Sequence, residues 1–380
     1  MIYHLLPETE IFSATLGGAV GRVVANMIGG NIEQKVVCQN ADETWRCDEK
    51  QIIIIPGLAA YAKLKGRRFL PSDLRKKLLR KIFRDLLPAL RPGDIVWSHD
   101  EPFFCEALEQ PIRGAGARLI YHSHNLLAFY RRYSVFRSFK ADAFIFISEA
   151  MRREGLEHFP WLANTHVVHN GADESLFFPP AERTGSNRPP TVLYVGRLFP
   201  YKGVHVLMES LRILEERGLS VTCKVFGSFH AAGNKVTPYM KHLFKVAPSG
   251  VKFEGHRSGR EIADEFRSAD IFCCPSIWQE PFGIVNIEAM ACGVPVVASR
   301  VGGIPEIGAE GGVVLVEPAS AARLADALEQ LLQNRTLREQ IGLEGLEAFR
   351  RRFSGKVINQ HYSAILSSLT AERISQETLT

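Results

Sequence analysis

The chain has 380 residues, of which 46% are hydrophobic and 23% charged, with a formal net charge of +5. This composition is typical of an ordinary soluble globular protein, and the length predicts two domains. No apolar run reaches the roughly 18 residues that a membrane-spanning helix needs. The opening "MIYHLLPETE" has neither the basic region nor the cleavage site of a signal peptide.

The first half of the chain alternates short apolar runs with helical stretches. The runs expected to form strands are 1–6, 35–39, 51–55, 94–99, 118–124, 143–148 and 166–170. Amphipathic stretches such as "DLRKKLLRKIFRDLLPAL" lie between several of them. This alternation predicts βαβ units and a parallel sheet.

The second half repeats the scheme after a proline-rich stretch. Its expected strands are 191–196, 222–227, 251–255, 270–276, 294–299 and 312–317. The sequence predicts an α/β architecture of two doubly wound Rossmann-like domains facing a central cleft. We expect an N-terminal domain over 1–178, a linker over 179–190 and a C-terminal domain over 191–356. Ligands of such sheets bind at the carboxyl ends of the strands.

Basic residues concentrate in the first half of the chain. Residues 63–91 hold eleven Lys or Arg and two Asp, and residues 131–140 add four Lys or Arg and no acid. A helix over 72–89 would carry basic residues beside Leu74, Leu78, Leu79, Ile82 and Leu86. It predicts either docking to an anionic lipid surface or an ordinary surface helix whose leucines face the core. No nucleic-acid motif accompanies these charges.

The seven cysteines show no CxxC or other metal-ligand spacing. They are interpreted as buried, reduced thiols of a cytoplasmic protein. The basic segment would allow this protein to lie peripherally on the inner face of a membrane.

Two cations follow the strand that ends at Gly196. Arg197 and Lys202 precede Gly203 and a helix start in "VGRLFPYKG". Fixed positive charge beside free backbone N–H groups favours an anion such as a diphosphate. Alternatively, both are solvated surface charges, since the spacing is not that of a P-loop.

Two glutamates bracket an uncharged stretch in "WQEPFGIVNIEAM", at Glu280 and Glu288. Pro281 and Gly283 force a loop, and residues 284–291 are expected to form a helix of about two turns that ends at Gly293. A carboxylate in such apolar surroundings is costly without a partner, so hydroxyl groups of a sugar would suit both. The alternative is that both merely favour the helix N-terminus electrostatically.

Glycines and histidines mark the ends of strands in the first half. Gly17 and Gly18 follow the first strand, which indicates either a tight turn or close approach of a ligand phosphate. In "YHSHN" we expect one of His122 and His124 to reach the cleft, and favour His124. The HxH spacing lacks an obvious third ligand, so no metal is expected.

Together, "VGRLFPYKG", "QEPFGIVNIEAMACGVPVVAS" and "VGGIPEI" resemble the retaining glycosyltransferases of family 4, which have the GT-B fold. Glu280 and Glu288 match the Glu-x7-Glu signature of that family. "VVHNGAD" at 167–173 also matches, and "FSGKVINQHYSAIL" at 353–366 is similar to the family's last helix, which returns to the first domain. The resemblance implies that a helix over about 357–380 completes the N-terminal, acceptor-binding domain.

The resemblance also implies residue roles. Arg197 and Lys202 would hold the diphosphate of a nucleotide-sugar donor, with Glu288 on the ribose and Glu280 on the donor sugar. His124 would line the donor sugar, and Asp100 would lie near the acceptor. The other implied donor-binding residues are Gly17, Gly18, Pro281, Phe282, Gly283 and Ile284.

The implied activity is sugar transfer to a glycan or glycolipid, as in the assembly of bacterial surface polysaccharide, lipopolysaccharide or exopolysaccharide. Anomeric configuration is retained, and neither a metal nor a cofactor is expected beside the nucleotide-sugar co-substrate. Alternatives are a nucleotide-sugar epimerase or phosphorylase of the same fold, or a non-catalytic nucleotide-sugar-binding or coat protein. No nucleic-acid partner is expected.

Overall fold

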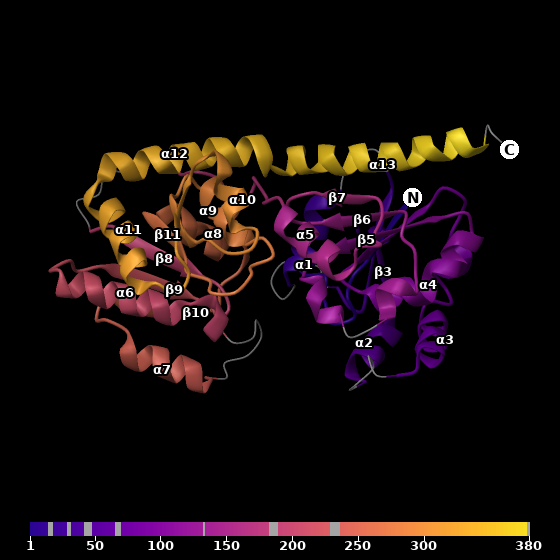
Figure 1. Cartoon of the computed structure of the whole chain (residues 1–380), viewed down its shortest axis with the longest axis horizontal. Helices are drawn as coiled ribbons and strands as arrows, with labels where there is room; N and C mark the ends of the chain where they lie inside the picture. The colour runs from indigo at the N-terminus through magenta and orange to yellow at the C-terminus, as the bar shows by residue number, and fades with distance from the viewer. Residues whose placement is uncertain are drawn as a thin grey trace. The chain divides into compact units, whose positions relative to one another are not determined.

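The structure is a computed structural model that describes residues 1–13, 18–28, 32–41, 48–64, 70–131, 134–181, 189–228 and 236–377. The chain divides into two compact units (Figure 1). One comprises Met1–His169 and Ile358–Thr380, and the other Asn170–Val357. This division lies nine residues before the predicted end of the first domain at 178, and most of the predicted linker, 182–188, is outside the described residues.

The first unit is built on a seven-stranded parallel sheet of order β3-β2-β1-β4-β5-β6-β7. Its strands are β1 (Ile2–Leu5), β2 (Gln34–Cys38), β3 (Ile52–Ile54), β4 (Ile95–His99), β5 (Arg118–Ser123), β6 (Ala143–Phe146) and β7 (Thr165–Val167). The strand order reverses direction at β1, which lies between β2 and β4. Ligand sites of doubly wound sheets lie at such a reversal.

The helices of this unit connect consecutive parallel strands. They are α1 (Ala19–Met27), α2 (Pro56–Lys63), α3 (Ser72–Ile82), α4 (Pro102–Gly114) and α5 (Glu149–His158), with short 3-10 turns at Glu49–Gln51, Leu87–Ala89, Leu127–Tyr130 and Ser134–Arg137. The C-terminal helix α13 (Gly355–Glu377) belongs to this unit from Ile358 on. Its Tyr362 packs edge-on against Trp97 of β4, with ring centroids 5.3 Å apart.

The second unit has a six-stranded parallel sheet of order β10-β9-β8-β11-β12-β13. Its strands are β8 (Thr191–Val195), β9 (Thr222–Phe226), β10 (Val251–Gly255), β11 (Ile271–Cys274), β12 (Val296–Ser299) and β13 (Val313–Val316). The helices and 3-10 turns are η6 (Pro200–Lys202), α6 (Val204–Glu216), α7 (Pro238–Val246), α8 (Gly259–Ser268), α9 (Ile284–Ala291), α10 (Ile304–Ile307), η7 (Gly308–Glu310), α11 (Ala321–Gln333) and α12 (Arg335–Arg352).

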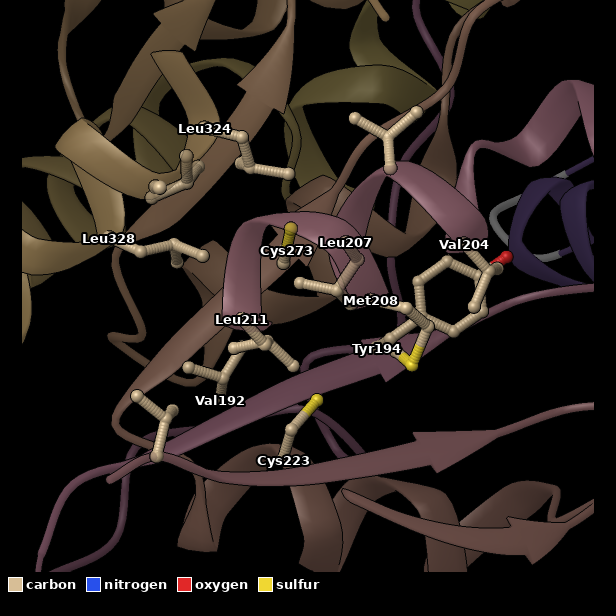
Figure 2. Packing of buried hydrophobic residues seen from close by; sticks show 14 of the residues in the cluster. Val192, Tyr194, Val204, Leu207, Met208, Leu211, Cys223, Cys273, Leu324 and Leu328 are labelled. Atoms are coloured by element: carbon tan, nitrogen blue, oxygen red, sulfur yellow. The ribbon is translucent and has the colours of Figure 1, made fainter. Parts of the chain in front are cut away.

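One core cluster of the second unit lies between its sheet and two helices (Figure 2). Val192 and Tyr194 of β8 pack under Leu207 and Leu211 of α6, and α11 contributes Leu324. Strands covered on both faces carry continuous apolar runs, which is why short runs were enough to predict them. Each of the thirteen predicted strands is present, and both sheets are parallel, as predicted.

The basic segment forms a shorter helix than predicted. The helix expected over 72–89 is α3, which ends at Ile82, whereas Pro88 lies in the 3-10 turn Leu87–Ala89. Leu79 and Leu86 are buried in the core, whereas Leu74 is 54% exposed. Part of the segment, 65–69, lies outside the described residues.

Candidate active site

Lys202 and Glu280 form an ion pair in the second unit. Lys202 Nζ donates to both carboxylate oxygens of Glu280, at 2.8 and 2.6 Å. Ser276 Oγ and Trp278 Nε1 donate to Glu280 Oε2 at 3.0 and 2.9 Å. The Glu280 side chain is 10% exposed and that of Lys202 17%. A carboxylate with three donors is balanced in charge and fixed in orientation.

Two glycines allow neighbouring loops to approach the segment that carries Glu280. Gly203 follows Lys202 at φ 71°, and a Cβ there would lie 1.8 Å from the carbonyl oxygen of Pro275. Gly302 has φ 54°, and a Cβ there would lie 2.0 Å from the carbonyl oxygen of Glu280. That oxygen also accepts a hydrogen bond from the backbone N–H of Gly303, at 2.9 Å. Both positions therefore require glycine.

Helix α9 begins directly after the Glu280 loop, and its predicted bounds of 284–291 are confirmed. Gly283 precedes it at φ 89°, and Gly293 follows it at φ 67°, also as predicted. Glu288 lies one turn inside the helix and is 3% exposed. The first N–H groups of a helix lack partners within it, so this end favours an anion.

The remaining predicted donor residues differ in exposure. Pro281 and Phe282 are buried, and Phe282 packs against Phe353 with ring centroids 5.9 Å apart. Ile284 is half-buried. Arg197 is exposed, with its guanidinium over the ring of Phe199 at 5.3 Å, and takes no part in the Lys202–Glu280 pair.

In the first unit, an internal carboxylate fills the space beside Gly18. Glu10 Oε1 accepts a hydrogen bond from the backbone N–H of Gly21 at 2.9 Å, at the start of α1. A Cβ on Gly18 would lie 2.6 Å from Glu10 Oε2. Burial raises the pKa of Glu10. Gly18 thus makes room for Glu10 in this structure, and Gly17 lies outside the described residues.

Asp100 binds the loop that carries His124. Its Oδ1 accepts hydrogen bonds from the backbone N–H groups of His124 and Asn125, at 2.7 and 3.1 Å. Its Oδ2 accepts a hydrogen bond from the side-chain amide of Asn125. Asp100 has φ 56° and is 8% exposed. Burial raises its pKa to about 6. The carboxylate is therefore engaged by the protein itself.

Sequence reasoning missed a cluster of buried histidines around His124. The ring centroids of His122 and His124 lie 4.1 Å apart, so the two side chains lie on the same side of the sheet. A third histidine, His99, comes from the neighbouring strand, where it pairs with His122 in register. Among the described residues, His99, His122 and His124 each place one ring nitrogen within 4.8 Å of the others.

A separate cavity of about 650 Å³ lies beside the edge strand β3. Its walls are mainly apolar, and its basic residues are Lys35, Lys81 and Arg84. Leu78 and Ile82 of α3 also line it. In the described part of the chain, no helix is long and apolar enough to cross a bilayer.

Two sequence families match the chain. "Glycosyltransferase Family 4" matches residues 20–176, and "Glycosyl transferases group 1" matches residues 181–347. Among curated relatives, an alpha-maltose-1-phosphate synthase of Mycolicibacterium smegmatis is 32% identical over 250 residues, covering 61% of this chain and 64% of the relative. A D-inositol 3-phosphate glycosyltransferase of Corynebacterium efficiens is 33% identical over 217 residues, 54% of this chain and 51% of that protein. The chain thus matches between half and two thirds of the length of these relatives.

Solved structures resemble the whole chain. Sucrose-phosphate synthase of Thermosynechococcus elongatus has a TM-score of 0.73 at 20% identity and covers 98% of this chain and 100% of its own. Anabaena HepE in complex with UDP and glucose also has a TM-score of 0.73 at 20% identity, covering 96% and 99%. These similarities show the GT-B fold. One family model matches most of the first unit, the other matches most of the second, and the curated relatives reported above agree with both. The chain therefore belongs to family 4 of the retaining glycosyltransferases.

Proposed function

We propose that this protein is a retaining glycosyltransferase that moves a sugar from a nucleoside-diphosphate sugar to a glycan or glycolipid. The observation that carries the proposal is the buried Lys202–Glu280 pair beside the start of α9. A cation, a hydrogen-bonding carboxylate and the N-terminus of a helix there match the three parts of such a donor: diphosphate, sugar hydroxyls and leaving oxygen.

The roles follow from this chemistry. Lys202 and the exposed Arg197 bind the diphosphate and stabilise its charge as the sugar leaves, so no metal is needed for that step. Glu280 accepts hydrogen bonds from hydroxyl groups of the donor sugar, and Glu288 accepts hydrogen bonds from hydroxyl groups of the ribose. Phe282, Gly283 and Ile284 contribute backbone groups, while buried Pro281 fixes the loop.

Donor binding must rearrange the Lys202–Glu280 pair. Glu280 Oε2 has three protein donors in this structure, so a sugar hydroxyl competes with them. When a diphosphate attracts Lys202, the carboxylate is released for the sugar. This coupling would link recognition of the two ends of the donor.

The first unit is proposed to bind the acceptor, with His124 at the donor sugar. The basic segment 63–91 would lie against anionic lipid on the inner face of a membrane, consistent with exposed Leu74 and with Lys81 and Arg84 at the β3 cavity. Surface polysaccharide or lipopolysaccharide assembly is the proposed setting.

The experiment is a thermal-shift panel of nucleoside diphosphates and nucleotide sugars, with UDP-glucose as the first probe because Anabaena HepE binds it. A ligand at a hundred times its Kd stabilises by about 2.7 kcal/mol. Glu288→Gln should lose most of the shift. Glu265→Gln, in a half-buried Lys–Glu pair of the same unit, is the matched control. Absence of any shift across the panel would refute the donor site.

The competing functions are separated by product analysis. A transferase hydrolyses or transfers its donor, whereas a non-catalytic binder leaves it intact. An epimerase would return a changed free sugar nucleotide, and a phosphorylase would require inorganic phosphate.

For the basic segment, sedimentation with vesicles gives the test. Binding to anionic vesicles should exceed binding to neutral ones and fall steeply with salt. Exchanging exposed Lys77, Lys81 and Arg84 for Gln should abolish it. The same exchange at exposed Arg212, Arg323 and Arg335 of the second unit is the control, and equal binding to both vesicle types would contradict the proposal.

A further inference from the structure

Four buried side chains form one hydrogen-bonded row across the first sheet. Gln34 Oε1 lies 2.9 Å from His4 Nε2, His4 Nδ1 lies 3.1 Å from His99 Nε2, and His99 Nδ1 lies 3.0 Å from His124 Nε2. The four residues come from β2, β1, β4 and the end of β5, which are neighbours in that order. Each is at least nine-tenths buried.

The three imidazoles in this row are neutral at neutral pH. Burial lowers the pKa of His4 to about 4, that of His124 to about 3, and that of His99 well below its usual value. A neutral imidazole has one N–H and one lone pair. Each nitrogen–nitrogen contact needs one proton, so all three rings must donate in the same direction along the row.

Gln34 sets that direction. Its Nε2 donates to the backbone oxygen of Met27 at 3.4 Å, so its Oε1 faces His4 and requires a proton on His4 Nε2. His4 Nδ1 then accepts from His99 Nε2–H. His99 Nδ1 in turn accepts from His124 Nε2–H, which leaves the lone pair of His124 on Nδ1.

We propose that Gln34, His4 and His99 are positioning residues that hold His124 in its Nε2–H tautomer and present Nδ1 as a hydrogen-bond acceptor to ligand. Asp100 supports the same arrangement by binding the backbone N–H of His124. In the described part of the chain, Nδ1 makes no hydrogen bond. A lone pair there accepts from a hydroxyl and repels phosphate or carboxylate oxygen, neither of which carries a proton.

The assigned ligand class is therefore a hydroxyl-bearing group, and under the proposed function that group is a hydroxyl of the transferred sugar. The tautomer itself does not depend on the proposed function. Because protonation of His124 is disfavoured, the ring acts as an acceptor rather than as a proton donor to the leaving diphosphate.

A metal ion bound by His99, His122 and His124 is the main alternative. Both ring nitrogens of His99 and Nε2 of His124 already make hydrogen bonds within the row. The lone pairs and protons of these nitrogens point along the row, so they do not converge on one metal ion. His122 stands outside the row, and its two ring nitrogens are buried without a hydrogen-bond partner in the described structure.

The test is nitrogen-15 NMR of the whole ligand-free chain with its 12 histidines labelled, assigned by single substitutions. We expect the protonated-nitrogen signal at Nε2 of His4, His99 and His124, and the lone-pair signal at Nδ1 of His124. A proton on Nδ1 of His124 overturns the proposal. So does zinc that remains bound after chelation and shifts the signals of His99 and His124.

A variant distinguishes positioning from coincidence. Gln34→Met removes the acceptor for His4, so the row should reverse and the two ring-nitrogen signals of His124 should exchange. Gln51→Met, at a half-buried position outside the row, should leave them unchanged. If Gln34→Met leaves His124 unaltered, the row does not set its tautomer. The wild-type spectrum stays decisive even if Gln34→Met folds poorly.

The two proposals fail separately. If the tautomers are as expected but no nucleotide binds, the row stands and the donor assignment falls. If nucleotides bind and His124 carries its proton on Nδ1, the donor assignment stands and the row falls.

Discussion

Lys202 Nζ lies 2.6 Å from Glu280 Oε2, although the two residues are 78 positions apart in the sequence. The pair is largely buried, so water solvates neither charge fully and each depends on its partner. Removing one partner leaves an uncompensated charge, which is far more costly than losing an exposed ion pair. The pair is therefore a structural element of the ligand-free protein as well as a candidate donor contact.

A double-mutant cycle should separate these two roles. Lys202→Met is expected to cost about 3 kcal/mol of unfolding free energy, and adding Glu280→Gln should restore part of it. Donor turnover should fall about 100-fold in both single variants and should not recover in the double variant. Guanidinium unfolding and donor hydrolysis provide the measurements.

The control pair is Lys224 with Glu265, which has the same residue types at 2.7 Å but is 34% and 27% exposed. Its coupling should stay below about 1 kcal/mol, with turnover unaltered. Coupling as small at Lys202–Glu280 would show that burial does not strengthen that pair.

Gly203 and Gly302 should tolerate no side chain. Gly203→Ala would place a Cβ 1.8 Å from the carbonyl oxygen of Pro275, and Gly302→Ala one 2.0 Å from that of Glu280. The Lys202 loop and the Gly302 loop, respectively, would have to move away from the segment that carries Glu280. We expect a cost of about 1–3 kcal/mol from this overlap, beyond the about 1–2 kcal/mol for a positive φ. A 1 Å displacement of these loops should lower donor kcat/KM about 100-fold.

Gly218→Ala is the matched control, because Gly218 has φ 82° but no atom within 4 Å of an added Cβ. It should show the φ penalty alone, with kcat/KM preserved. Equal losses of stability in all three variants would mean that the close approach has no energetic role.

The fold was largely predictable from local pattern, whereas the site was predictable only in part. The bounds of α9 followed from Gly283, Gly293 and an apolar run between them, all within one short stretch. The Lys202–Glu280 pair could not be predicted, because it depends on how two distant loops approach. The contact of Glu10 with Gly18 likewise depends on tertiary structure that no spacing encodes.

The histidine row shows the same limit. His4, His99 and His124 become neighbours through the order and register of β1, β4 and β5. In the sequence these three histidines are far apart, and nothing in their local spacing links them. The register that aligns them depends on packing over the whole sheet.

The buried histidines should make the protein sensitive to acid. Their pKa values are lowered in the folded chain, so below about pH 6.5 the unfolded chain takes up protons that the folded chain does not. The free energy of unfolding should fall by up to about 1.4 kcal/mol per pH unit for each imidazole. This loss should continue to about pH 4 for His4 and about pH 3 for His124.

Unfolding measured from pH 7 to pH 5 tests this slope. His122→Leu removes one buried imidazole, and burial lowers the pKa of this imidazole well below its usual value. The dependence of unfolding free energy on pH should therefore weaken by the equivalent of about one proton taken up on unfolding. His361→Gln is the control, since that side chain is exposed. An unchanged slope in His122→Leu would contradict neutral burial of this ring.

Asp100 should act in the opposite sense. Its pKa rises from 3.8 to about 6 on burial, so the folded chain retains a proton that the unfolded chain has lost, and stability should fall as pH rises from about 4 to 6. Asp100→Asn keeps an acceptor for the backbone N–H of His124 and tolerates φ 56°, and should remove this pH-dependent contribution. Asp100→Ala should instead cost about 2–3 kcal/mol at every pH, because two backbone N–H groups lose their acceptor.

Unfolding at pH 5 and pH 7.5 separates the two Asp100 variants, and the rate of donor hydrolysis should fall further in Asp100→Ala than in Asp100→Asn. The reverse order of activities would indicate that the carboxylate itself acts on substrate rather than holding the His124 loop.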